Sequence, residues 1–174
     1  MFAITERLLL RPGWAEDAPA LARALGDERI VRNLTRVPWP YTLGDAEQFL
    51  ALSHEPQRPC FLICLRDRPE LIGGIGIQGA NAELGYWIAR DHWGRGYATE
   101  AGHAVIALAD ESLRLPRLTS SHATDNPASG KVLRKLGFGP TGKKVWAASH
   151  GRATPMEMRL FAREGEQPRQ ALAA

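Results

Sequence analysis

The segment at residues 83–124 constrains the fold more than any other part of the chain. It begins with the strand-like stretch ELGYWI, passes through the short turn HWGRG into a long helical stretch, and ends in the strand-like stretch RLTSSHAT. A strand, a crossover helix and a second strand form a βαβ unit, in which the two strands run parallel and the crossover is right-handed. The centre of the sheet is therefore predicted to contain a parallel pair.

The segments around this unit predict a mostly antiparallel sheet with helices beside it. Further strands are expected at residues 4–11, 60–66, 70–78, 144–148 and 156–162, and helices at 14–25, 44–52, 97–113 and 126–137. The last helix is the best delimited, with Asn126 as N-cap, Pro127 at the first helical position and Gly137 as terminator. Cys60 and Cys64 share one strand face, where buried free thiols are expected rather than a zinc site.

Length and charge limit the function classes. The chain has 174 residues, which suits one domain. Its 22 basic and 19 acidic residues give a formal net charge of only +3, so a dedicated nucleic-acid surface is not expected, whereas an anionic small ligand is compatible. No apolar run approaches the ~18 residues of a membrane span, and the N-terminal residues lack a signal-peptide layout. A cytoplasmic protein without membrane contact is expected.

Two glycine-rich stretches resemble nucleotide-binding motifs, and only one has the required context. The stretch GGIGIQG carries Gly74, Gly76 and Gly79 in the dinucleotide spacing GxGxxG. That fingerprint needs a helix to begin at the glycines, so that helix N–H groups meet a pyrophosphate. Here a turn and a strand are predicted to follow. We therefore reject dinucleotide binding and expect bulges or close strand packing at these glycines.

The turn HWGRG at residues 92–96 has the context that the first motif lacks, because it follows a predicted strand and opens a predicted helix. The first N–H groups of a helix have no partners within it, and the helix dipole adds about half a positive charge there. Gly94 and Gly96 lack the Cβ atoms that would block a close approach, and Arg95 adds a formal charge. An anion site is predicted, with an ordinary tight turn as the alternative.

Several spaced motifs resemble the GNAT acetyltransferase superfamily, specifically the branch of the RimJ/RimL ribosomal-protein N-terminal acetyltransferases. They are TERLLLRP, PWPYT, AELGYWIARDHWGRGYATEA and NPASGKVLRKLGF, and they cover most of the chain. The resemblance implies a single GNAT domain at residues 1–163 of mixed α/β class. Its sheet is expected to have six to seven mostly antiparallel strands, a splayed parallel central pair and about four flanking helices. Residues 164–174 are expected to form a frayed tail.

The resemblance also implies a binding site for acetyl-CoA and no metal. The family's pyrophosphate loop, Q/R-x-x-G-x-G/A, aligns with Trp93–Ala98, where Trp93 replaces the usual Gln or Arg. This departure leaves the backbone N–H groups in place, and Trp93 is expected to pack under the loop. The pantetheine arm is expected along the strand near Ile88. The residues implied for the coenzyme are Ile88, Ala89, Arg90, Trp93, Gly94, Arg95, Gly96, Tyr97, Ala98, Thr99, Asn126 and Ser129.

The chemistry of amide formation suggests catalytic residues. An amine that attacks a thioester loses a proton, and the sulfur leaves as a thiolate. Because a thiol has a pKa of about 8.5, a weak acid suffices. Ser129 matches the position where the related enzymes place a hydroxyl near the sulfur, and plain helix capping is the alternative. Glu83 is our candidate base, while His122, Asp125 and a water relay remain open.

The expected function is acetyl transfer to a primary amine, on a protein N-terminus or a small molecule, by direct attack. The alternative is a catalytically silent protein that binds an acyl-CoA. Trp39 and Tyr41, on a loop, are expected to line the acceptor pocket, with packing at a core edge as the alternative. His150 and Arg152 are expected to decorate a turn rather than to meet an anionic substrate. A monomer and a homodimer are both compatible with the sequence.

Overall fold

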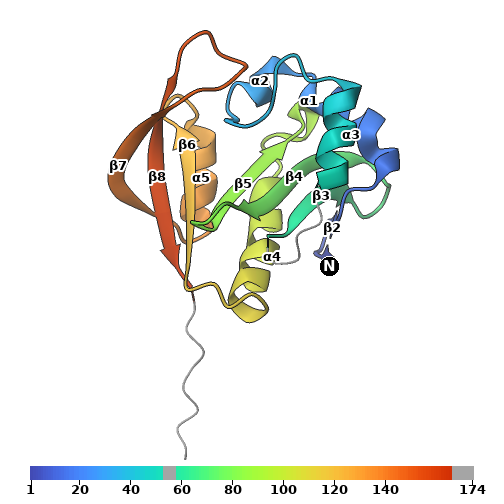
Figure 1. The fold of residues 1–174 in the computed structure, drawn as a ribbon. Helices are drawn as coiled ribbons and strands as arrows, with labels where there is room; N and C mark the ends of the chain where they lie inside the picture. Colours follow the sequence, from blue (N-terminus) through green and yellow to red (C-terminus); the bar gives the residue numbers. More distant parts are fainter. Residues whose placement is uncertain (53–57, 166–174) are drawn as a thin grey trace, which may run out of the picture.

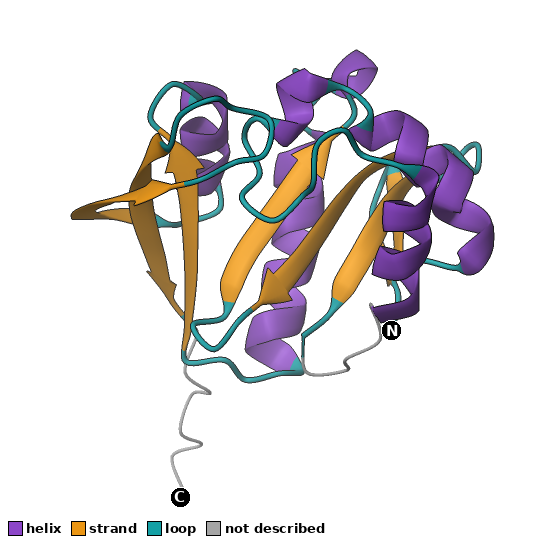
Figure 2. Ribbon diagram, turned by 45° about the horizontal axis from the view of Figure 1, so that its top comes forward, coloured by secondary structure: helices purple, strands orange, loops and turns teal. Residues whose placement is uncertain are grey.

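The computed structural model describes residues 1–52 and 58–165, which form one eight-stranded sheet with helices against both faces (Figures 1 and 2). The strands are β1 Ala3–Ile4, β2 Leu8–Arg11, β3 Cys60–Leu65, β4 Leu71–Gln78, β5 Glu83–Ile88, β6 Arg117–Ala123, β7 Gly139–Ala147 and β8 Met156–Glu164. The helices are α1 Ala18–Leu25, α2 Glu28–Val31, α3 Leu43–Leu52, α4 Tyr97–Glu111 and α5 Pro127–Lys135, with 3-10 turns η1 Ala15–Asp17 and η2 Arg90–His92. The strand order is β1-β2-β3-β4-β5-β6-β8-β7. The predicted mixed α/β fold with a central parallel pair is confirmed.

The sheet has eight strands rather than six to seven, because residues 4–11 do not form one strand. A turn at Thr5 divides them into the antiparallel pair β1 and β2. The Thr5 N–H donates to Leu8 O at 2.9 Å, and the Leu8 N–H donates to the Thr5 hydroxyl at 3.0 Å. Threonine side chains that bind nearby backbone favour such turns. The fifth helix is α2, whose cap Asp27 accepts the Arg29 N–H at 2.9 Å.

The C-terminal strands are longer than predicted. Strand β7 begins at Gly139 rather than near residue 144, and its pairing with β8 shifts register between Pro140 and Lys144. Because this irregularity interrupts the regular alternation of side chains, the sequence pattern does not reveal the first part of the strand. Strand β8 continues to Glu164, which pairs with Arg117 of β6. The expected tail therefore begins within a strand, and residues 166–174 lie outside the described residues.

The parallel strands β5 and β6 are paired only near their beginnings. Their register contains the single pair Glu83 and Thr119. The next contact comes from a side chain, because the Ser120 hydroxyl donates to Leu84 O at 2.8 Å. Farther along, the two strands diverge (Figure 1). The expected splay of the central pair is thus present, and it leaves a gap between the carboxyl-terminal halves of the strands.

Alternation along β5 sends neighbouring side chains to opposite faces of the sheet. Leu84, Tyr86 and Ile88 pack in the core that includes residues of α4 and α5. Trp87 packs against the core formed with α1 and α3. The gap beside β5 therefore opens toward both faces of the sheet, and the two faces carry different side chains. No helix within the described ranges is long and apolar enough to cross a membrane.

The rejected dinucleotide fingerprint lies in β4 and the turn after it, and that turn leads into β5. A Cβ on Gly74 would lie 2.6 Å from Trp87 Nε1, and one on Gly76 would lie 2.8 Å from Pro59 O. Gly79 has a φ of +68° in the turn. These glycines are required by close packing and turn geometry, which confirms the interpretation from the sequence.

Candidate functional site

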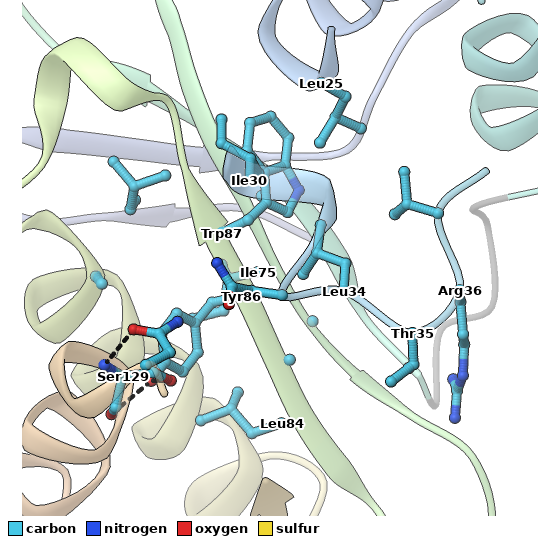
Figure 3. A pocket seen from close by; sticks show the side chains of 18 of the residues that line it. Leu25, Ile30, Leu34, Thr35, Arg36, Ile75, Leu84, Tyr86, Trp87 and Ser129 are labelled. Carbon is cyan, nitrogen blue, oxygen red and sulfur yellow. Dashed lines mark hydrogen bonds between the residues drawn. The ribbon is translucent and has the colours of Figure 1, made fainter. Parts of the chain in front are cut away.

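A cavity of about 940 Å³ lies where β5 and β6 diverge (Figure 3). One wall comes from α1, α2 and the segment that follows α2, and another comes from β4 and β5. Residues of α3, β3 and β6, the turn before α4, helix α5 and the loop between β7 and β8 also contribute to the lining. Leu25, Ile30, Leu34 and Trp87 form an apolar part of the wall, and Ser129 adds a hydroxyl group (Figure 3).

The turn before α4 and the first turn of that helix line this cavity. Gly94 and Gly96 have φ angles of +75° and +82°, a region open to glycine at little cost, and Gly96 is the N-cap of α4. Because α4 begins at Tyr97, the N–H groups of its first turn have no acceptor within the helix. The cavity is lined here by Gly94, Gly96, Tyr97, Ala98 and Thr99.

Arg7, from the turn between β1 and β2, braces this glycine turn. Its guanidinium donates to Arg95 O at 3.0 Å, pairs with Glu100 at 2.6 Å and lies 4.6 Å from the centre of the Tyr97 ring. The Thr5 hydroxyl donates to the same Glu100 carboxylate at 2.6 Å. Burial raises the pKa of Glu100, but the hydrogen bonds from Thr5 and Arg7 outweigh it and leave that pKa lowered. The brace is therefore an ionised network at neutral pH.

Trp93 lies beside the turn, with its indole at the surface. The indole N–H donates to Ile88 O at 2.7 Å, and the residue is 47% exposed. The prediction that Trp93 packs under the loop is thus wrong, because the indole reaches back to a carbonyl that faces the gap beside β5. Ile88 and Trp93 line the cavity, whereas Ala89, Arg90 and Arg95 lie outside its lining.

The backbone of β5 offers a second set of polar groups, which fits a pantetheine arm. Leu84 O and Ile88 O accept side-chain donors on the β6 side of the strand. By alternation, the N–H and C=O groups of Tyr86 face the same side, and the pairing of β5 with β6 does not extend that far. An open strand edge for amide groups, next to helix N–H groups for phosphates, suits the coenzyme that the sequence implies.

Ser129 lies in the first turn of α5 and lines the cavity. Asn126 caps this helix, since its side-chain oxygen accepts the Ser129 N–H at 3.3 Å, as predicted for the N-cap. The Ser129 hydroxyl oxygen lies 2.8 Å from the Tyr86 phenol oxygen, and the phenol also lies 3.1 Å from Ser129 O, to which it can donate (Figure 3). Burial raises the pKa of Tyr86 to about 12, so the phenol is protonated at neutral pH.

The three candidate bases differ in position. Glu83 lines the cavity, accepts the Ser121 hydroxyl at 3.0 Å and lies 3.7 Å from the Arg36 guanidinium. His122 lies outside the cavity lining, because its ring packs against Phe161 with 5.3 Å between ring centres. The structure therefore brings Glu83, but not His122, to the site.

Asp125 also lines the cavity, but arginines hold its carboxylate. Arg152 donates to its two oxygens at 2.8 and 2.9 Å, and Arg32 lies 3.7 Å away. The hydrogen bonds from Arg152 keep the pKa of Asp125 below its usual value. Such a carboxylate is a poor proton acceptor near neutral pH. Arg152 therefore lines the cavity, although it was expected only to lie on a surface turn. His150 lies outside the lining.

The two loop aromatics expected at the acceptor pocket have different positions. Tyr41 is half-buried and lines the cavity, where burial and the nearby Asp45 carboxylate raise the pKa of its phenol to about 12. Trp39 is also half-buried but lies outside the cavity lining. Only Tyr41 is therefore placed to touch a ligand in this cavity.

No group of three or more His, Cys, Asp or Glu side chains within residues 1–52 and 58–165 is arranged to hold a metal ion. Cys60 and Cys64 are free thiols in β3, Cys64 buried and Cys60 partly buried. Burial raises the pKa of Cys60 to about 11, so this thiol is protonated at neutral pH. The expected pair of free thiols is present.

Sequence reasoning missed several residues of this site, among them Tyr86 and Arg7. Alternation in ELGYWI places Tyr86 on the strand face opposite to Glu83 and Trp87. A tyrosine on a buried strand face needs a hydrogen-bond partner for its phenol, and this was the signal that could have indicated Tyr86. Arg7 stands in a stretch that was assigned to one strand. Its role depends on Glu100, 93 residues later, for which no local signal exists.

Comparisons with known proteins identify the family of this chain. Residues 7–139 match the acetyltransferase (GNAT) domain family. The chain is 33% identical over 150 residues to YoaA of Bacillus subtilis (strain 168), named an uncharacterized N-acetyltransferase, with 79% of this chain and 84% of the relative covered. It is 35% identical over 83 residues to the ribosomal-protein-serine acetyltransferase of Escherichia coli (strain K12), with 45% of each covered.

The fold is shared with solved acetyltransferase structures. RimL, the ribosomal L7/L12 alpha-N-protein acetyltransferase in complex with coenzyme A, superposes with a TM-score of 0.80 at 20% identity, covering 95% of this chain and 98% of that one. That likeness supports the architecture, while the family match and the similarity to YoaA extend over most of the sequence. This chain therefore belongs to the GNAT acetyltransferase family.

Proposed function

We propose that this acetyltransferase moves an acetyl group from acetyl-CoA to a primary amine by direct attack. The observation that carries the proposal is the hydrogen-bonded pair Tyr86 and Ser129, which lines the cavity close to the glycine turn. Membership of the GNAT acetyltransferase family supports acetyl as the group that is transferred. The coenzyme A bound in the RimL complex supports acetyl-CoA as the donor of that group.

In this proposal the first turn of α4 holds the pyrophosphate of the donor. The N–H groups of Tyr97, Ala98 and Thr99 and the positive end of the helix dipole stabilise negative charge there. The pantetheine arm lies along the edge of β5 that faces β6, where the backbone of Tyr86 supplies hydrogen-bonding groups. Asn126, at the start of α5, is expected to contact the arm.

The donor supplies a thioester, whose carbonyl carbon bonds to the amine nitrogen as the carbon–sulfur bond breaks. Ser129 gives a proton or a hydrogen bond to the departing sulfur. The one phenol proton of Tyr86 can go to Ser129 O or to Ser129 Oγ. In this proposal it goes to Ser129 Oγ, which frees the Ser129 proton for the sulfur and strengthens the serine as a donor. A pKa of about 8.5 for the leaving thiol makes such a weak acid sufficient.

Glu83 is proposed as the final acceptor of the amine proton. About 10 Å of strand separates Glu83 from Tyr86, so the proton travels through a water relay. Asp125 is engaged by Arg152, and His122 lies outside the cavity lining, which favours Glu83 among the carboxylates and histidines considered. Glu83→Gln is expected to shift the acidic limb of the pH–rate profile. An unmoved profile would remove Glu83 from the mechanism.

The acceptor is a protein N-terminus or a small-molecule amine. The similarity to the ribosomal-protein-serine acetyltransferase supports the first. The test is release of free coenzyme A thiol from acetyl-CoA with amino-acid, aminoglycoside, polyamine and peptide N-terminal amines. Turnover with one class supports the proposal. Binding of acetyl-CoA by calorimetry without turnover of any amine would indicate a silent binding protein.

Ser129→Ala tests the acid directly. It is expected to lower kcat while the Kd for acetyl-CoA changes little, because the hydroxyl acts on the leaving sulfur rather than on the phosphates. Ser112→Ala is the matched control, since Ser112 is exposed at the C-terminal end of α4. An unchanged turnover number in Ser129→Ala would leave Ser129 with helix capping alone.

A further inference from the structure

The cavity lining carries more positive than negative side chains. Its basic residues are Arg29, Arg32, Arg36, Lys131, Lys135 and Arg152, and its acidic residues are Asp45, Glu83 and Asp125. The two lysines belong to α5, which carries Ser129. The arginines come from α2, the segment after it and the β7–β8 loop, so they belong to the other wall.

Asp125 is shared by two of these arginines. Arg152 donates to both carboxylate oxygens and also to Arg32 O at 2.6 Å, and its side chain is only 13% exposed. The Arg32 guanidinium lies 3.7 Å from Asp125, beyond hydrogen-bonding distance, and is 48% exposed. Two guanidinium groups and one carboxylate leave one excess positive charge at this wall. Because Arg152 makes both hydrogen bonds to the carboxylate, the N–H donors of Arg32 are the ones left to bind a ligand.

Arg32 lies close to the proposed reaction centre. Asp125 immediately precedes Asn126, the N-cap of α5, and Ser129 lies in the first turn of that helix. The contact of Arg32 with Asp125 therefore places the guanidinium near the N-terminal end of α5, the end that carries Ser129. Arg29 also lines the cavity, three residues before Arg32 on the same helical face.

We propose that the acceptor is a primary amine that carries a carboxylate a few bonds from its nitrogen, and that Arg32 binds this carboxylate. The inference rests on the proposed function and names its substrate class. A guanidinium binds a carboxylate through two parallel charge-assisted hydrogen bonds. Leu25, Ile30, Leu34 and Trp87 form an apolar part of the cavity wall, which suits an apolar body on the acceptor (Figure 3).

The test compares leucine with leucinamide, which share the side chain and the amine but differ in the carboxylate. Rates are expressed per concentration of unprotonated amine, because amidation lowers the pKa of the amine. The intact protein is expected to favour leucine at least about tenfold in kcat/KM. Arg32→Gln is expected to raise the KM for leucine and remove the preference while leaving leucinamide unchanged. Arg32→Lys keeps the charge without the fork and is expected to retain part of the preference.

Arg23→Gln is the matched control, since Arg23 is exposed on α1 and lies outside the cavity lining. A second pair, amidated peptides with aspartate or asparagine after the first residue, distinguishes a peptide carboxylate from that of a free amino acid. Preference for the acidic member of either pair supports the proposal. Equal kcat/KM within both pairs overturns it and leaves the proposed function intact. Preference that survives Arg32→Gln overturns the role of Arg32, and absence of thiol release with every amine overturns both proposals.

Discussion

The phenol oxygen of Tyr86 lies 2.8 Å from the hydroxyl oxygen of Ser129, although the residues are 43 positions apart in the chain. Tyr86 belongs to β5 and Ser129 to α5, so the contact crosses the gap that opens beside β5. A second acceptor, Ser129 O, lies 3.1 Å from the phenol oxygen, so both oxygens of Ser129 are within reach of the phenol proton. The contact thus joins the strand edge proposed for the pantetheine arm to the hydroxyl proposed for the leaving sulfur.

Tyr86→Phe is expected to lower kcat by about tenfold to a hundredfold, at the low end of general-acid effects, because Tyr86 acts through Ser129. The KM for acetyl-CoA should change little, since the ring remains in the core. The double variant with Ser129→Ala should be no slower than Ser129→Ala alone, because the two groups act as a unit. Steady-state kinetics of the three variants checks this. Additive losses would show that Tyr86 acts independently of Ser129.

Arg7→Gln is expected to raise the KM for acetyl-CoA by about tenfold with little change in kcat. The substitution removes the charge-assisted bonds to Arg95 O and Glu100, which hold the glycine turn but do not touch the reacting atoms. Arg66→Gln is the control, because Arg66 binds the same hairpin through Thr5 O at 2.7 Å. A fall in kcat at unchanged KM would place the effect of Arg7 elsewhere.

Local signals in the sequence predicted the parts of the site that depend on nearby residues. Asn126, Pro127 and Gly137 delimited α5 within two residues, because caps and terminators act over one helical turn. Gly94 and Gly96 likewise predicted the turn before α4. Glycine adopts positive φ angles without help from distant residues, so the glycines themselves are a local signal for such a turn.

Contacts between distant segments escaped prediction. Alternation assigns Tyr86 to a face of β5, but only the packing of α5 on the sheet brings Ser129 to it. The turn at Thr5 is stabilised by Glu100 from α4, so residues 4–11 resemble one strand when considered alone. The engagement of Asp125 by Arg152 likewise depends on how the β7–β8 loop folds back over α2.

Gly96→Ala is expected to destabilise the protein by about 1–2 kcal/mol and to raise the KM for acetyl-CoA. An alanine at a φ of +82° is strained, and relief of that strain would displace the first N–H groups of α4. Gly139→Ala is the control, because a Cβ there meets nothing within 4 Å and its φ is not positive. Urea denaturation and initial rates measure the two effects. Equal stability of both variants would mean that the turn accepts alanine without strain.

The partly buried pair of Arg11 and Asp17 is expected to make stability depend on acid pH. Arg11 donates to both Asp17 oxygens at 2.7 Å, and each side chain is 12% exposed. Burial raises the pKa of Asp17, but the bonds from Arg11 and the Trp14 N–H outweigh it and lower the pKa overall. Because the folded pKa lies below the unfolded value, the stabilisation is present above the unfolded pKa and is lost as pH falls through the folded one.

Asp17→Asn is therefore expected to lower the free energy of unfolding by about 2 kcal/mol at pH 7 and to flatten its decline below pH ~4. Urea denaturation at a series of pH values from 7 to 2 measures both quantities. Glu16→Gln removes the same charge from an exposed neighbour and should leave the pH dependence close to that of the intact protein. Since η1 leads into α1, which supplies Leu21 and Leu25 to the cavity wall, Asp17→Asn should also weaken acceptor binding more than acetyl-CoA binding. A pH dependence unchanged by Asp17→Asn would show that this pair contributes nothing to acid sensitivity.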